Sequence, residues 1–394
     1  MLPRTADAVV VGGGINGASI AFHLALSGMR NIAVVEAVTA AHGASSRGAG
    51  IIRTFYANDG EARLAIASLA VFRNWRDEVG GTAGYNPCGF LWMVGPGDAE
   101  GVEAIVGRQR ALGAVSEVLP ADEIARLQPH LDVHGIGVAA YEPQGGFGMP
   151  ALATASLHAA AQRLGARLHE GVHVEAINAE GGRVTGVSTT AGSIAAPVVV
   201  LAAGCWSAAL AAGLGVTLPL APTRMTTGTI RHAPLAPSPF AFIDTVTDTF
   251  FRPSEDAGVS HVSIRDDRHN TELPPGDGWV SETVAASASH DGIARLKARV
   301  PHIRAEPLHA WVGPDGVTPD KRAVYGKVDG VEGLVLCVGG NYKGFKVAPA
   351  VGRSIAELIT TGRSRIDLSA FSLQRFGDGR AASGPGSYSL ADVA

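Results

Sequence analysis

The chain contains very little cysteine and, over most of its length, no lysine. Its 394 residues include only three cysteines, Cys88, Cys205 and Cys337, which lie far apart and form no C-x-x-C pair. A disulfide framework or a metal site is therefore not expected. Five lysines occur, and the first 296 residues have none. Arginine carries most of the positive charge, so the close pair Lys343 and Lys346 stands out against this background.

Long apolar runs and a strong excess of one charge are also absent. No run reaches the about 18 apolar residues of a membrane-spanning helix. The first apolar stretch has only a strand's length and leads into glycines, so we expect no signal peptide and a cytoplasmic protein. The net charge of −4 gives no indication of nucleic-acid binding. Since 46% of the residues are hydrophobic, we expect a sizeable core in one composite domain or two moderate ones.

The N-terminal segment carries the most informative pattern. Residues 7–11 are typical of a short buried strand, and residues 18–26 are typical of an apolar helix. Between them lie Gly12, Gly14 and Gly17, with the spacing G-x-G-x-x-G. In dinucleotide-binding βαβ units, such glycines allow a tight turn, close approach of a pyrophosphate and close packing of the helix on the strand.

A second strand over 31–35 ends at Glu36, about 20 residues after Gly14. A carboxylate at this place accepts hydrogen bonds from a ribose diol, which disfavours NADP and leaves NAD or FAD open. Two later apolar strands, over 197–204 and 334–340, also end in glycine. Ligands of open α/β sheets bind at such carboxyl ends. The sequence therefore predicts a Rossmann-like dinucleotide site.

Arg53 is an isolated charge in the strand-like segment 51–56, which follows a loop of small residues over 37–50. Two interpretations are open: a surface arginine, or a guanidinium aimed into a pocket to bind a carboxylate.

The remaining segments alternate between helix, strand and turn patterns. We expect helices over 61–82, 99–113, 121–127, 151–164, 292–299 and 347–360, and a loop over 341–346. We expect strands over 85–94, 184–189, 218–230, 240–251 and 259–264, and two short ones within 167–177. The tail from residue 376 is rich in glycine, serine and alanine and is expected to be poorly ordered.

Taken together, these segments resemble the D-amino-acid oxidase/sarcosine oxidase superfamily of FAD-dependent amine oxidoreductases. The resemblance covers nearly the whole chain and rests on the combination of motifs, because no single motif is specific. The matching segments are VVVGGGINGAS (9–19), SSRGAGIIR (45–53), LHEGVHVEAI (168–177), VVVLAAGCWS (198–207), VTPDKRAVYG (317–326) and LVLCVGGNYKGFKVAPAVG (334–352).

The resemblance implies a mixed fold, α/β plus α+β, in which a discontinuous Rossmann-like FAD-binding domain carries an antiparallel-sheet substrate domain. We assign residues 1–84, 145–215 and 310–375 to the FAD-binding domain. Residues 85–144 and 216–309 then form the substrate domain, and residues 376–394 form a flexible tail.

The resemblance also implies which residues hold FAD. Glu36 and the glycines of the first turn would hold its ADP part, and the backbone of Val174 would contact adenine. The full expected set is Gly12, Gly14, Ile15, Asn16, Gly17, Glu36, Ser45, Ser46, Arg47, Gly48, Val174, Ala203, Gly204, Gly339, Gly340, Lys343, Gly344, Phe345 and Lys346.

For the substrate, the resemblance implies a carboxylate held by Arg53 and Lys346, with Tyr342, Tyr56 and Lys343 at the border of the pocket. The implied reaction is oxidation of the C–N bond of a small amino acid, with a secondary, N-methyl or cyclic amine favoured. A hydride passes to flavin N5, and the imine product then hydrolyses. The electron acceptor is oxygen or another carrier.

Two departures from the family pattern refine this expectation. Some members attach FAD through a cysteine before the TPD-like turn, but residues 311–316 contain none, so we expect noncovalent FAD. Sarcosine oxidases place a lysine over the flavin, whereas residues 260–264 contain none, which favours a dehydrogenase. His261 lies in that stretch, although a lone strand histidine more often has a structural role.

Two other functions stay open at this point. The first is an FAD-dependent 2-hydroxy-acid dehydrogenase, which needs a base for the hydroxyl proton, with His261 as the candidate. The second is a flavoprotein subunit of a larger complex that binds without reacting. In each case the expected partners are small molecules and not nucleic acids, and the oligomeric state is left open.

Overall fold

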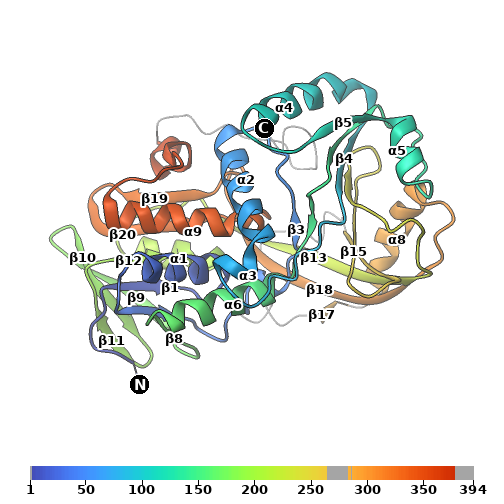
Figure 1. Cartoon of the computed structure of the whole chain (residues 1–394). Helices are drawn as coiled ribbons and strands as arrows, with labels where there is room; N and C mark the ends of the chain where they lie inside the picture. The colour runs from blue at the N-terminus through green and yellow to red at the C-terminus, as the bar shows by residue number, and fades with distance from the viewer. Residues whose placement is uncertain (1, 264–282, 285, 378–394) are drawn as a thin grey trace.

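The structure, a computed structural model, describes residues 2–263, 283–284 and 286–377. Within these residues the chain forms two nine-stranded sheets and one two-stranded sheet. Figure 1 shows the first large sheet on the left, covered by helices α1 and α9, and the second on the right, flanked by α4, α5 and α8. The helices are α1 (Ile15–Leu26), α2 (Asp59–Arg73), α3 (Trp75–Glu78), α4 (Ala99–Ala111), α5 (Ala121–Leu127), α6 (Pro150–Arg163), α7 (Ser207–Ala212), α8 (Ser289–Arg299) and α9 (Gly344–Thr361).

The first sheet has the order β11-β10-β20-β12-β1-β2-β8, with β19 paired to β20 and β9 paired to β10. Its strands are β1 (Ala8–Val11), β2 (Ile32–Val35), β8 (Arg167–His169), β9 (Val174–Glu180), β10 (Arg183–Thr189), β11 (Gly192–Ala195), β12 (Val199–Leu201), β19 (Val324–Val328) and β20 (Val331–Val338). The central strands β20, β12, β1, β2 and β8 are mutually parallel. This sheet confirms the predicted Rossmann-like core.

Apolar side chains cover both faces of these parallel strands. In β1, Val10 belongs to the core under α1 and α9, whereas Val9 and Val11 belong to the core on the opposite face. Burial on both faces explains why parallel strands read as continuous runs of valine rather than as an alternating pattern. Helices α1 and α9 approach so closely that a Cβ on Gly352 would lie 2.1 Å from Ser19 Oγ.

Because the central strands are parallel, the residues that follow them meet at one edge of the sheet. Gly12 follows β1, Glu36 follows β2, Gly204 comes three residues after β12, and Gly339 follows β20. This edge is where an open α/β sheet binds its ligands.

The second sheet has the order β17-β18-β13-β16-β15-β14-β4-β6-β5. Its strands are β4 (Phe90–Val94), β5 (Glu117–Pro120), β6 (Val138–Glu142), β13 (Ala221–His232), β14 (Ala241–Asp244), β15 (Thr249–Pro253), β16 (Val259–Ser263), β17 (Thr283–Val284) and β18 (Ala305–Val317). All its pairings are antiparallel except β4 with β14, which is parallel. The predicted antiparallel sheet is therefore largely confirmed, with this one exception. The third sheet pairs β3 (Ile51–Ile52) with β7 (Gly146–Phe147).

Several local predictions are corrected by the structure. The loop expected over 341–346 ends early, because α9 begins at Gly344 and includes Lys346. The single strand expected over 240–251 is split into β14 and β15, and the break contains Asp248 with φ +56°. The helix expected over 61–82 is divided at Asn74 into α2 and α3.

The predicted domain division stays a prediction, and β18 runs across residue 310, where we placed one boundary. Of the expected tail, Phe376 ends a short 3-10 helix (Leu373–Phe376), and residues 378–394 lie outside the described residues. Ile264, the end of a predicted strand, also lies outside them. No helix in the described part of the chain is long and apolar enough to cross a membrane.

Candidate functional site

A long cavity of about 1310 Å³ runs along the carboxyl edge of the first sheet and continues toward the second sheet. Most of the predicted cofactor and substrate residues line it. Those that do are Gly12, Gly14, Ile15, Asn16, Glu36, Ser45, Gly48, Arg53, Val174, Ala203, Gly204, Gly339, Gly340, Tyr342, Lys343, Gly344, Phe345 and Lys346. Gly17, Ser46, Arg47, Tyr56 and His261 are not among the lining residues.

One end of the cavity carries Glu36. Its Oε2 accepts a hydrogen bond from the Gly13 backbone N–H (2.7 Å), and its Oε1 accepts one from the Val38 N–H (2.9 Å). These bonds fix the carboxylate directly beside the glycine turn. Val174, at the start of β9, lines the same end.

The N-terminus of α1 lies at the middle of the cavity. Gly12 has φ +109°, and a Cβ there would lie 2.5 Å from the Ala202 carbonyl oxygen, so only glycine fits. Gly17 lies against the same turn, since its Cβ would meet the Gly12 carbonyl oxygen at 2.0 Å. The Ser45 hydroxyl accepts the Ile15 N–H (2.9 Å), which brings the small-residue loop onto the helix end.

Arg47 stabilises that loop and does not line the cavity. Its Nη1 donates to the carbonyl oxygens of His42 and Gly43. In turn, the Arg47 carbonyl accepts a hydrogen bond from Trp311 Nε1 (3.0 Å). Arg47 therefore connects the loop to β18, a structural role that its place in a flavin-like motif did not indicate.

Arg53 follows β3 and lies at the other end of the cavity. Its side chain is only 6% exposed, which excludes the interpretation as a surface arginine. The guanidinium lies over the rings of Tyr56 and Trp92, with Cζ 4.2 Å and 4.8 Å from the ring centroids. It also donates to the Phe55 carbonyl. No carboxylate within the described residues forms an ion pair with it.

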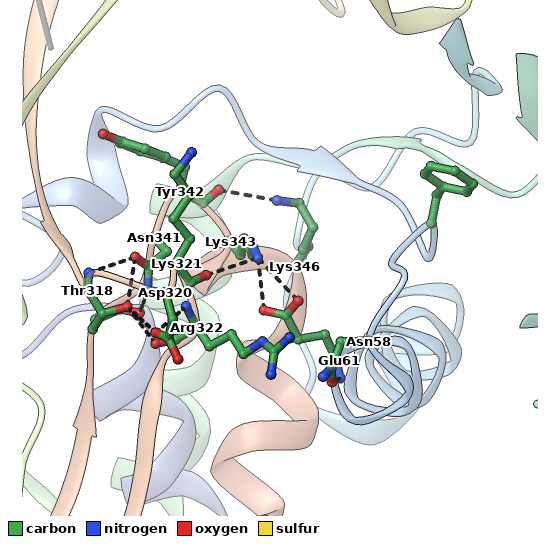
Figure 2. A network of polar contacts seen from close by, with 12 residues as sticks. Asn58, Glu61, Thr318, Asp320, Lys321, Arg322, Asn341, Tyr342, Lys343 and Lys346 are labelled. Atoms are coloured by element: carbon green, nitrogen blue, oxygen red, sulfur yellow. Dashed lines mark hydrogen bonds and ion pairs between the residues drawn. The ribbon is translucent and has the colours of Figure 1, made fainter. Parts of the chain in front are cut away.

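Lys346, in the first turn of α9, is buried in the same part of the wall. Its Nζ donates to the Tyr342 carbonyl oxygen (3.2 Å), as Figure 2 shows. Burial, followed by the positive charges of Arg53 and Lys343, lowers the pKa of Lys346 well below its usual value. Glu61 and Asp315 act in the opposite direction. An anionic ligand bound beside Arg53 would therefore favour the charged form of Lys346.

Lys343 is close by but has a partner of its own. Its Nζ contacts both carboxylate oxygens of Glu61 (3.0 and 3.2 Å) and the Lys321 carbonyl oxygen (3.1 Å). Both members of this ion pair are largely buried, at 14% and 8% side-chain exposure. Lys343 therefore lines the cavity, as predicted, but its ammonium group forms an ion pair with Glu61 of α2.

Tyr342 occupies a strained turn between the two lysines and the sheet. Asn341 and Tyr342 both have positive φ, at +48° and +63°, which is uncommon for residues other than glycine. Asp315 stabilises this turn, because its carboxylate accepts the N–H groups of Tyr342 and Gly316. Burial raises the pKa of the Asp315 carboxyl to about 6. The strain therefore places the Tyr342 carbonyl where Lys346 reaches it.

Three acidic residues near the cations were missed from the sequence: Glu61, Asp315 and Glu142. Glu142 accepts two hydrogen bonds from Thr54, and burial raises its pKa to about 7. Glu61 had a recognisable local signal, because the Asn58 side chain caps α2 by accepting the Glu61 N–H (3.1 Å). That signal predicts a helix start and gives no indication of Lys343. We find no sequence signal for Asp315 or Glu142.

His261 lies on β16 opposite Arg252 of β15. Arg252 Nη2 lies 3.0 Å from His261 Nε2, and because arginine only donates, the histidine carries its proton on Nδ1. Burial, followed by the charge of Arg252, lowers the pKa of His261 to about 3. The ring packs edge-on against Trp311. This placement does not support His261 as a base.

The cavity lining contains groups that suit the parts of FAD. Glu36 suits a ribose diol, and the open turn at Gly12 with the N-terminus of α1 suits a pyrophosphate. The Oδ1 atom of Asn16 is buried in this wall without a hydrogen-bond partner in the described structure, as expected of a group that contacts a ligand. Gly204, Gly339 and Gly340 also line the cavity.

The fold and cavity define a dinucleotide-binding protein of the Rossmann type. Residues 7–358 match the DAO family, described as FAD dependent oxidoreductase, and the chain belongs to this family. Of the two cofactors left open by the glycine motif, FAD is therefore the one that this family uses.

Three known proteins show the range of this similarity. The chain is 28% identical over 385 residues to 4-methylaminobutanoate oxidase (formaldehyde-forming) of Paenarthrobacter nicotinovorans, covering 95% of this chain and 46% of the relative. It is 25% identical over 389 residues to the mitochondrial pyruvate dehydrogenase phosphatase regulatory subunit of Mus musculus, covering 95% and 44%. The chain thus spans less than half the length of these relatives. The crystal structure of glycine oxidase from Geobacillus kaustophilus has a TM-score of 0.79 and 26% identity, covering 95% of this chain and 99% of the other.

Proposed function

We propose that the chain oxidises the C–N bond of a small amino acid whose carboxylate is bound by Arg53 and Lys346. The carrying observation is the placement of these two buried side chains in one part of the cavity wall, without an ion-pair partner in the described residues. Two basic side chains in one buried site favour an anionic ligand, because an anion stabilises the charged forms of both. When bound, FAD supplies the two-electron acceptor, which takes a hydride at N5.

The chain's own residues orient the substrate and exclude water. Arg53 is held by the Tyr56 and Trp92 rings, so a carboxylate meets a preorganised guanidinium. Trp92, Ile243 and Phe250 line the cavity on the side of the second sheet. These apolar side chains suit an alkyl substituent on the amine, which supports a secondary, N-methyl or cyclic amine. The likeness to a methylaminobutanoate oxidase supports the same preference.

Two other functions, a 2-hydroxy-acid dehydrogenase and a flavoprotein subunit without its own reaction, fit the cavity less well. A 2-hydroxy-acid dehydrogenase needs a base, and His261 is bonded to Arg252 and does not line the cavity. A flavoprotein subunit without its own reaction is favoured by the likeness to a regulatory subunit. Against it, both basic side chains that suit a carboxylate, Arg53 and Lys346, are present, together with Glu36.

Flavin bleaching without oxygen separates these functions. The purified protein is mixed with N-methyl, cyclic and primary amino acids, with 2-hydroxy acids, and with amines that lack the carboxylate. We expect bleaching by secondary amino acids and little by amines without a carboxylate. Bleaching by hydroxy acids alone would refute the proposal in favour of a dehydrogenase for them. An FAD-bound protein that no compound bleaches would identify a non-reacting subunit.

The electron acceptor and the way in which FAD is held are also proposed. We propose a carrier other than oxygen, because residues 260–263 of β16 contain no lysine. After bleaching, reoxidation by an artificial acceptor should then be much faster than reoxidation by oxygen. We also propose that FAD is bound noncovalently, because residues 311–316, before the Thr318-Pro319-Asp320 turn, contain no cysteine. The discontinuous FAD-binding domain remains part of the proposal.

A further inference from the structure

Oxidation of an amine by hydride loss requires the nitrogen lone pair, yet a small amino acid carries an ammonium group at neutral pH. Some group must therefore accept a proton when the substrate enters. This requirement rests on the proposed function. A suitable acceptor is a basic atom with a free electron pair, placed in the cavity wall where a bound carboxylate would lie.

The Lys346 side chain meets this description in its geometry. Its Nζ is in the cavity wall, and its side chain is 7% exposed. It donates one hydrogen bond, to the Tyr342 carbonyl oxygen, and forms no ion pair in the described part of the chain. A neutral amine has two hydrogens and one lone pair, and no donor in the described residues is hydrogen-bonded to Nζ, so the lone pair is not engaged there.

The charged groups around Lys346 favour this neutral amine. Arg53 and Lys343 face it as cations, and together with burial they lower the pKa of Lys346. Glu61 opposes this effect, but its carboxylate is bonded to Lys343. Asp315 also opposes it, but its carboxylate accepts two backbone N–H groups, and its pKa is raised to about 6.

Tyr56 packs against the Arg53 guanidinium and adds no negative charge, because burial raises the pKa of its hydroxyl above the usual value. The carboxylates of Glu61 and Asp315 are bonded to other donors, and neither forms an ion pair with Lys346.

We propose that Lys346 accepts the ammonium proton of the incoming amino acid. The substrate N–H bond breaks, its electron pair stays on the substrate nitrogen, and the lone pair of Nζ forms the new N–H bond. No proton is exchanged with solvent. The step converts the substrate to the neutral amine and turns Lys346 into an ammonium that pairs with the substrate carboxylate. Arg53 and Lys346 thus differ in role, because Arg53 is charged before and after binding.

Proton stoichiometry of ligand binding tests this step without turnover. Two ligands are titrated into the FAD-bound protein by calorimetry, in buffers of different ionisation enthalpy, from about pH 6 to about pH 10. Methoxyacetate has a carboxylate and no removable proton. The amino acid 2-aminoisobutyrate has a removable ammonium proton but no hydrogen on its α carbon, so it cannot lose a hydride there.

We expect methoxyacetate to take up about one proton per molecule bound, in the pH range between the pKa of Lys346 in the empty site and its higher pKa beside the carboxylate. Within that range its affinity should fall about tenfold per pH unit. At the same pH, 2-aminoisobutyrate should bind with almost no uptake, because it brings the proton with it.

Lys346→Arg keeps a cation for the carboxylate but does not titrate in this range. It should bind methoxyacetate without proton uptake, whereas the exposed control variant Lys327→Met should behave as the native protein. Binding of methoxyacetate without uptake by the native protein, or equal uptake by Lys346→Arg, would overturn this inference alone. Failure of both ligands to bind would overturn the proposed function and this inference with it.

Discussion

Replacing Arg53 by methionine tests whether the cavity recognises a carboxylate. The side chain is 6% exposed, and its guanidinium is oriented by Tyr56 and Trp92 rather than by an ion pair. A substrate carboxylate would therefore not compete with a carboxylate of the protein for the Arg53 guanidinium. A hydrogen bond to a charged group contributes about 1.5–3 kcal/mol. Losing it should raise the apparent substrate constant about ten- to a hundredfold.

The assay is flavin bleaching without oxygen, with a carboxylated amine and a matched amine in which a methyl group replaces the carboxylate. Arg53→Met should weaken only the carboxylated amine and leave FAD bound. Arg53→Lys keeps the charge but loses the planar stacking on two rings, so we expect an intermediate effect. If Arg53→Met weakens both amines equally, Arg53 supports the flavin or the fold, and the reasoning from its burial and missing ion pair is wrong.

Four other outcomes follow from the structure. Glu36→Ala should weaken FAD binding by about 1–3 kcal/mol in a flavin titration, because buried N–H and O–H donors lose their acceptor; unchanged affinity would contradict the assigned role. Acid precipitation should release all flavin into the supernatant, and colour retained on the precipitate would show a covalent bond. Glu61→Gln should destabilise the protein in urea by about 3–5 kcal/mol, because it leaves buried Lys343 unpaired, whereas Glu332→Gln, in an exposed pair, should cost no more than about 1 kcal/mol. Because the pKa of Lys346 is lowered in the folded protein, its charge destabilises the folded state fully below the folded pKa, and this destabilisation disappears above the unfolded pKa of about 10.4. Lys346→Met should therefore raise the melting temperature of the substrate-free protein at neutral pH, and the increase should become smaller toward high pH.

Local chemistry accounts for the parts of the site that the sequence predicts well. Gly12 requires a positive φ, and Gly17 a close approach of the helix, and both requirements act over a few residues. Glu36 lies at the end of a strand whose length and composition predict it. The helix expected from residue 61 begins at Asp59, where the Asn58 side chain caps it, a local signal that lies in the sequence. Each of these features needs only its own βαβ unit or helix end.

The resemblance of the motifs, rather than their spacing, brought Arg53 and Lys346 together, since they are almost 300 residues apart. The structure places both in one cavity wall. It also distinguishes Lys346 from Lys343, which lies three residues earlier at the N-cap of α9, although the sequence offers no reason to treat them differently. Lys343 is bonded to Glu61, which lies 282 residues away in the chain.

By itself, the sequence determined the glycine turns, the buried parallel strands and the carboxylate that follows β2, because these depend on backbone conformation and on the burial of neighbouring side chains. Tertiary structure alone decided which charged side chains meet at the substrate end. The pairing register of β15 with β16 directs Arg252 to His261 and disfavours that histidine as a base. The packing of α2 on α9 brings Glu61 to Lys343 and leaves Lys346 without a carboxylate of its own. Burial and the distances between charges set a pKa, and both arise only when segments distant in the chain pack together.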